Sequence, residues 1–209
     1  MKNLKISTIS QIREQIAKAP AGKPFVGSSL RHLAPTDNLR KILERLTKSG
    51  EIKRIARGVF IKPKQVAYLG EYLPSTREVV EVLAQASGEI ISIHGAEAAR
   101  QLRLSTQVPM QTVFYTTGNS RKIKIGKRTV TLKHVSPKKL IMPGTIVGTA
   151  ITALWYLGRK NVSLKTLEII HQQLTQKDFN TVLQQIPYMP AWMAGVFFHF
   201  QQSKRISNE

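Results

Sequence analysis

Apolar residues recur at helical spacing near the start of the chain and are followed by turn-forming residues. Isoleucines three and four residues apart predict a helix over residues 7–19, which Pro20 and Gly22 bring to an end. Phe25-Val26 is expected to be extended. A short helix is expected at residues 28–33, because Pro35 disfavours helical geometry in the residue before it.

The clearest amphipathic pattern lies at residues 37–49, which we predict to be a helix with Thr36 as its N-cap and Gly50 after its end. Its apolar stripe has the spacing i, i+3, i+4, i+7 and consists of Leu39, Ile42, Leu43 and Leu46. The opposite surface carries charged side chains at the same helical spacing, namely Arg40, Lys41, Glu44, Arg45 and Lys48.

Two short strands are predicted next, at residues 52–55 and 59–61, joined by a hairpin-like turn at Ala56-Arg57-Gly58. The order helix, short helix, turn, helix, hairpin is typical of a winged helix-turn-helix. We therefore expect residues 1–65 to form a DNA-binding domain of that kind.

The remainder, residues 66–209, predicts a second domain that is mixed α/β over 75–135 and helical over 137–202. Its expected helices are 75–87, 94–102, 145–157, 163–173, 175–186 and 190–202, and its expected strands are 89–92, 112–116, 122–125 and 129–135. The predicted fold class is α+β: a winged helix-turn-helix followed by an α/β domain with a helical C-terminus.

One stretch, residues 140–158, contains no charged residue and approaches the length that spans a bilayer. It includes Pro143, Gly144 and Gly148, and its helical part is too short to span. We expect a buried core helix and no membrane association. The start of the chain also lacks the pattern of a secretory signal, and with no cysteine in the chain this favours a cytoplasmic protein.

The net charge is the most informative feature of the composition. The chain carries 32 Lys and Arg against 12 Asp and Glu, a net charge of +20, which indicates a polyanionic partner. Residues 1–65 alone carry a net +11. A solvated basic helix face is common, but here three basic elements follow one another in the order that a DNA-binding unit requires.

We expect the predicted DNA contacts to come from the first helix of the pair, the 37–49 helix and the hairpin. The 37–49 helix fits the major groove, the first helix crosses the backbone, and the hairpin reaches phosphate or the minor groove. The two serines can bind phosphate or simply cap their helix. The candidate residues are Ser28, Ser29, Arg31, Asn38, Arg40, Lys41, Arg45, Lys48, Lys53, Arg54 and Arg57.

A second basic patch is predicted on the later strands, where Lys122 and Lys124 alternate with Ile123 and Ile125. It is either a solvated hairpin face or a further contact to phosphate, RNA or an acidic partner. Its members are Arg121, Lys122, Lys124, Lys127, Arg128, Lys138 and Lys139.

No arrangement of residues predicts an enzyme, a metal site or a cofactor. The five histidines are scattered, and carboxylates are scarce. Glu78 and Glu81 share a predicted helix, but Glu81 is expected to face solvent. Gly118 and Gly126 belong to turns, since no phosphate-loop motif is present.

The run LRKILERLTKSGEIKRIARGVF at residues 39–60, after Phe25-Val26 and Leu33, resembles the N-terminal winged helix of AbiEi-type antitoxins. The run VSPKKL at 135–140, followed by glycines at 144 and 148, is similar to their second domain. The resemblance implies a bacterial repressor that binds operator repeats and autoregulates a toxin–antitoxin operon. It places repression on Arg40, Lys41, Arg45, Arg54 and Arg57.

The resemblance also implies a nucleotidyltransferase-like toxin as partner, countered without a stable complex, and dimerisation is common among such repressors. A regulator without a toxin fits equally well. The alternative function is an RNA- or ribosome-associated basic protein, for which Phe114 and Tyr115 are the candidate stacking residues.

Overall fold

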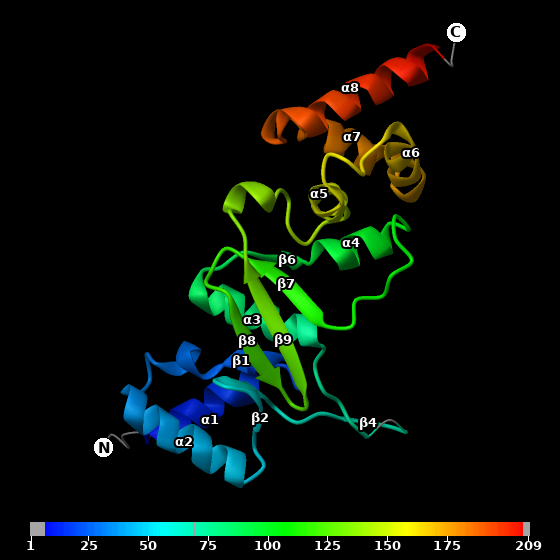
Figure 1. The fold of residues 1–209 in the computed structure, drawn as a ribbon. Helices are drawn as coiled ribbons and strands as arrows, with labels where there is room; N and C mark the ends of the chain where they lie inside the picture. Colours follow the sequence, from blue (N-terminus) through cyan, green and yellow to red (C-terminus); the bar gives the residue numbers. More distant parts are fainter. Residues whose placement is uncertain (1–6, 69, 207–209) are drawn as a thin grey trace. The chain divides into compact units, whose positions relative to one another are not determined.

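The computed structural model describes residues 7–68 and 70–206, and Figure 1 labels its helices and strands. By its internal contacts the chain divides into two compact units. Unit 1 comprises residues 1–89 and 122–130, and unit 2 comprises residues 90–121 and 131–209. The expected boundary after residue 65 differs from this division, because residues 66–89 and a later hairpin tip cluster with the first unit. The fold class is α+β, as predicted, and the last element is a helix.

Unit 1 begins with the elements that the sequence predicts, in the predicted order. They are α1 (Thr8–Lys18), β1 (Pro24–Val26), the 3₁₀ helix η1 (Gly27–Leu30), α2 (Thr36–Lys48), β2 (Lys53–Ala56) and β3 (Val59–Ile61). The strands form an antiparallel sheet in the order β1-β3-β2, with Phe25 and Arg54 on either side of Phe60. The extended segment at Phe25-Val26 is thus the third strand of the hairpin sheet.

Two local expectations in unit 1 are wrong. The helix expected at residues 28–33 is only the 3₁₀ helix η1, and Arg31 follows it as its C-cap. The six residues between Gly27 and Ala34 are too few for a stable α-helix. Thr36 is the first residue of α2 and not its cap, a position that Pro35 occupies without a side-chain hydrogen bond.

The second part of unit 1 contains a small two-stranded arm and a helix. The arm pairs β4 (Gln65–Val66) with β5 (Gly70–Glu71) and was not predicted. Helix α3 (Thr76–Ser87) begins with a capping box, in which Ser75 and Glu78 satisfy each other's backbone N–H groups. It packs against β1.

Unit 2 combines short strands with a helical bundle. Its elements are β6 (Ile91–Ile93), α4 (Gly95–Gln101), β7 (Thr112–Thr116), η2 (Pro137–Lys139), α5 (Ile146–Leu157), α6 (Leu164–Gln173), α7 (Gln176–Gln184), η3 (Ile186–Tyr188) and α8 (Ala191–Ile206). The residues of β8 (Arg121–Ile125) and β9 (Arg128–His134) are divided between the two units. The strand order is β6-β7-β9-β8. The outer part of the β8–β9 hairpin, residues 122–130, belongs to unit 1.

The uncharged stretch at residues 140–158 forms the centre of unit 2, as predicted. Eight consecutive residues of α5, from Val147 to Leu154, are buried, and α4 and α7 pack against the helix. Gly148 permits close approach of the preceding loop, because a Cβ there would lie 2.1 Å from the carbonyl oxygen of Met142. Within residues 7–68 and 70–206, no helix is long and apolar enough to cross a membrane.

Candidate nucleic-acid interface

Helix α2 carries the strongest candidate surface. Leu39, Ile42, Leu43 and Leu46 are all buried, which confirms the predicted apolar stripe. They pack with Ile12 of α1 and with the sheet, and so form the core of unit 1. Asp37 lies in the first turn, where the helix dipole stabilises a negative charge. The packing fixes which face of α2 is turned outward.

The outward face of α2 is cationic and accessible. Lys41 and Arg45 are exposed, and neither forms an ion pair with any residue that the structure describes. Arg40 lies 3.9 Å from Asp37, but both side chains are largely exposed, so the pair is weak and easily exchanged for a phosphate. Asn38, near the start of the helix, is exposed as well.

Lys48, at the end of α2, is less available than the sequence suggests. Its Nζ lies 3.2 Å from the carboxylate of Glu44, one turn earlier. Such exposed i,i+4 pairs contribute only about 0.3–0.5 kcal/mol, so a polyanion can still displace Glu44. The cationic side chains of α2 that are most available to a polyanion are therefore those nearer its N-terminus and centre.

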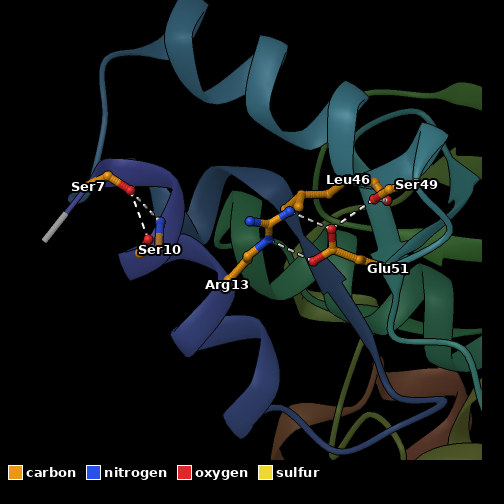
Figure 2. Close-up of polar contacts among 6 residues, drawn as sticks. All are labelled: Ser7, Ser10, Arg13, Leu46, Ser49 and Glu51. Atoms are coloured by element: carbon orange, nitrogen blue, oxygen red, sulfur yellow. Dashed lines mark hydrogen bonds and ion pairs between the residues drawn. The ribbon is translucent and has the colours of Figure 1, made fainter.

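An exposed ion pair joins α1 to the turn after α2. Figure 2 shows the guanidinium of Arg13 facing the carboxylate of Glu51, with Nε–Oε2 and Nη2–Oε1 distances of 2.8 Å. The Ser49 hydroxyl lies 2.9 Å from Glu51 and 3.1 Å from the Leu46 carbonyl oxygen. Hydrogen bonds from Arg13 and then Ser49 lower the pKa of Glu51. This contact connects α1 to the C-terminal end of α2.

The segment before α2 presents one cation and two serines with different roles. Arg31 and Ser28 are exposed. The Ser29 hydroxyl donates to the carbonyl oxygen of Val26, at 2.7 Å, so its proton is used within the fold. Neither serine caps η1, whose N-cap Val26 lacks a side-chain hydrogen bond. Ser28 thus remains a candidate contact, whereas Ser29 could act on phosphate only as a backbone donor.

The β2–β3 hairpin presents its cations unequally. Arg57 is exposed in the turn, which Gly58 completes with a positive φ of 74°. Lys53 is paired with Glu71 of the β4–β5 arm. The Nε of Arg54 donates to the carbonyl oxygen of Ala56, at 3.4 Å, which holds the side chain along its own strand. The hairpin tip therefore offers Arg57 as its most accessible charge.

The tip of the β8–β9 hairpin meets the β2–β3 hairpin within unit 1. The Gly126 N–H donates to the carbonyl oxygen of Ile55, at 3.2 Å, although the two residues are far apart in sequence. Gly126 has a positive φ of 56°, and Lys127 and Arg128 are exposed beside it. The alternation predicted for β8 is confirmed, since Lys122 and Lys124 are exposed while Ile125 is buried.

The structure divides the predicted second basic patch between the two units. Lys122, Lys124, Lys127 and Arg128 belong to unit 1, whereas Arg121, Lys138 and Lys139 belong to unit 2. The Lys139 ammonium lies 5.0 Å from the centre of the Trp155 ring, a cation–π contact within unit 2. The part of the patch with a defined relation to α2 is therefore the hairpin tip.

The two aromatic residues proposed for stacking on RNA bases pack against other residues of unit 2. Phe114 is buried in unit 2. The Tyr115 ring packs against His94, with ring centres 4.8 Å apart. Burial lowers the pKa of His94, and the nearby Lys133 lowers it further. The Nδ1 of this neutral imidazole accepts a hydrogen bond from the Ala96 N–H, so His94 caps α4.

The two glutamates of α3, Glu78 and Glu81, form contacts within their own helix and its N-cap. Glu78 completes the capping box of α3, and Glu81 pairs with Arg77 at 2.7 Å. Among the residues that the structure describes, no group of three or more His, Cys, Asp or Glu side chains is arranged to hold a metal ion.

The sequence pattern of the family described as "Family of unknown function (DUF6088)" matches residues 11–182, so the chain belongs to that family. The match begins within α1 and ends within α7. No curated protein and no solved structure matches the chain.

Proposed function

We propose that this member of the DUF6088 family is a sequence-specific DNA-binding transcriptional repressor. The DNA-binding part is the α1–β3 segment acting as a winged helix-turn-helix. The observation that carries the proposal is the outward face of α2, where Lys41 and Arg45 are exposed and unpaired within the described chain while the leucine face is buried. A helix with one packed face and one cationic face is suited to the major groove.

Different elements of unit 1 contact different parts of the DNA in this proposal. In the proposed complex the N-terminal half of α2 lies against base edges, where Asn38 and Arg40 can form bidentate hydrogen bonds. Lys41 and Arg45 bind the flanking phosphates, and Arg31 binds the backbone on one side. The β2–β3 hairpin is the wing, with Arg57 at its tip. Base contacts supply specificity, and phosphate contacts supply most of the affinity.

The β8–β9 tip adds a second cationic loop beside the wing. This role is supported by the hydrogen bond between Gly126 and Ile55 and by the exposure of Lys127 and Arg128. Phosphate contacts from this tip would lengthen the DNA footprint without adding base specificity.

The biological setting follows from the resemblance to AbiEi-type antitoxins. We propose an antitoxin-like cytoplasmic regulator that autoregulates a toxin–antitoxin type operon by binding operator repeats. Two copies bound to a repeat would place their α2 helices about one helical turn of DNA apart, roughly 34–36 Å. A nucleotidyltransferase-like toxin would be countered without a stable complex. The RNA-binding alternative has less support, because Phe114 is buried and the half-buried Tyr115 already packs against the His94 ring.

The test is binding of the purified protein to a labelled duplex from upstream of its own gene, measured by fluorescence anisotropy. Replacing Lys41 and Arg45 together by Ala should weaken binding by about 10–100-fold and reduce the salt slope by about 2. Replacing exposed Arg159 and Lys160 of unit 2 by Ala removes the same charge and serves as the control. Equal affinity of both double variants would remove α2 from the mechanism.

A scrambled duplex of the same length tests sequence specificity. We expect at least a thousandfold preference for the upstream duplex at physiological salt. A structured RNA that binds more tightly than this duplex would make RNA the partner.

A further inference from the structure

A groove runs along one flank of α2 in unit 1, with a volume of about 820 Å³. It is lined by residues of α2, of the last turns of α3, of η1 and of the β2–β3 hairpin. This volume lies within the usual range of small-molecule sites, about 300–1,000 Å³. Of the charged face of α2, Arg40, Glu44 and Lys48 line the groove, whereas Lys41 and Arg45 do not.

The inner surface of the groove is apolar. Leu43 and Phe60 lie at its base, and Leu83 and Ala86 contribute from α3. Gly27 keeps this base closely packed, because a Cβ there would lie 2.8 Å from Leu43 Cδ1 and 3.1 Å from Phe60 Cε2. A sugar–phosphate backbone is hydrophilic and gains little from covering such a surface, whereas an aromatic body gains from its burial.

The rim of the groove is cationic. Arg31, Arg40, Arg54 and Lys48 line it, together with a single acidic residue, Glu44. Glu44 is already engaged by Lys48, at 3.2 Å, which leaves the three arginines to set the local potential. Arginine presents a planar fork that binds carboxylate, sulfonate or phosphate groups bidentately.

We infer that this groove binds a small organic anion with an aromatic or otherwise apolar body, and that the bound anion competes with DNA. Its apolar body lies on Leu43, Phe60 and Leu83, and its anionic group is held by the arginines of the rim. Arg31, Arg40 and Arg54 are also proposed DNA contacts, so occupation of the groove withdraws them from the duplex. The binding site stands by itself, while the competition rests on the proposed function.

The first experiment uses two fluorescent probes of nearly the same shape. 8-Anilino-1-naphthalenesulfonate carries a sulfonate, and N-phenyl-1-naphthylamine lacks it. We expect saturable binding of the sulfonate probe to the folded protein, with affinity at least about tenfold above that of the neutral probe, because only the sulfonate makes a charge-assisted contact with the arginines. Equal affinity for the two probes would overturn the anion specificity.

The second experiment locates the probe with adjacent substitutions on α3. Ala86 lines the groove and Gln85 does not, and both are exposed. Ala86→Trp fills the space and should reduce binding of the sulfonate probe at least about tenfold, whereas Gln85→Trp should change it less than about twofold. Circular dichroism confirms that both variants are folded. Unchanged binding to Ala86→Trp would place the probe elsewhere and overturn the inference.

The third measurement separates the site from the proposed function. Added sulfonate probe should release the labelled duplex from the wild-type protein but not from Ala86→Trp at the same concentration. Probe bound in the groove together with undiminished DNA binding would overturn the competition. A wild-type protein that binds the probe but no DNA would contradict the proposed function and leave the groove intact.

Discussion

The two units of this protein differ in charge and in the size of their apolar cores. Unit 1 carries 20 Lys and Arg against 8 Asp and Glu, and its core lies among α1, α2 and a three-stranded sheet. Unit 2 carries 12 against 4 and builds a larger apolar core around α5, with buried residues from α4 to α8. The acidic residues of unit 1 stabilise its own helices and turns, and this leaves Lys41, Arg45 and Arg57 available for a polyanion. From this comparison we expect unit 2 to contribute more to stability, and we propose unit 1 as the surface for a polyanion.

The largest effect is expected from opening the core of unit 2. Phe197 is fully buried in α8 and packs with Phe179. Phe197→Ala should lower the free energy of unfolding by about 3–5 kcal/mol, through lost burial and a residual cavity. Denaturant unfolding measures the loss. The folded fraction should keep its DNA affinity within about twofold, and a large loss there would show that the two units are not separable in function.

The corresponding change in unit 1 should affect both properties. Leu46 is fully buried at the centre of the α2 stripe. Leu46→Ala should cost about 2–5 kcal/mol in unfolding free energy and also weaken DNA binding, because α2 loses its fixed orientation. Calorimetry and anisotropy on the same sample test the two effects. Loss of stability with full DNA affinity at a temperature where the variant is folded would contradict the role of α2.

The β8–β9 tip should contribute a smaller, less specific amount. Lys127→Ala combined with Arg128→Ala should weaken DNA binding by about 3–10-fold, equally for the upstream and scrambled duplexes, and reduce the salt slope by about 2. The Arg159 and Lys160 double variant is again the matched control. An unchanged slope would leave the tip as a solvated hairpin end.

The smallest expected effect is the dependence of stability on pH, which should differ between the two units. The pKa of His94 is lowered below its ordinary 6.5, so the stability that depends on neutral His94 is present above pH 6.5 and is lost as the pH falls through the lowered pKa. Protonation also removes the cap on α4, worth about 1 kcal/mol. His94→Asn keeps a capping side chain and should flatten the stability of unit 2 below pH 6.5. An identical pH profile for the variant would exclude His94.

Unit 1 should respond only at lower pH. The pKa of Glu51 is lowered below its ordinary 4.5, so its contribution is present above pH 4.5 and is lost as the pH falls through the lowered value. Glu51→Gln should remove that acid-dependent loss from unit 1. Chemical shifts of α1 amides followed through an acid titration provide the measurement.

Local pattern was sufficient for much of the fold. The buried stripe of α2 is confirmed because helical periodicity and burial of apolar residues follow from the same geometry. The same reasoning located α5, whose uncharged run is buried on nearly every side. Helix η1 was overestimated, since a segment that short takes its conformation from its packing against α2 and the sheet.

The parts of the site that were not predictable depend on contacts between distant residues. Nothing in residues 121–128 indicates that Gly126 bonds to Ile55, because no local pattern encodes a pairing across that separation. The wall that α3 adds to the groove beside α2 is likewise a product of tertiary packing. The reduced availability of Lys53 depends on Glu71, in an arm that the sequence did not predict.

The absence of cysteine from the chain permits a direct test of where α2 lies on DNA. Asp37→Cys places a thiol on the exposed face of α2, and Glu168→Cys places one at an exposed position of α6 with the same change of charge. Each variant is labelled with an iron–EDTA reagent and bound to the upstream duplex. We expect strand cleavage by the Asp37→Cys conjugate, confined to positions that face the major groove where each copy binds, and none at those positions by the other conjugate. Absent or uniform cleavage from Asp37→Cys, with the duplex still bound, would contradict the placement of α2 in the major groove.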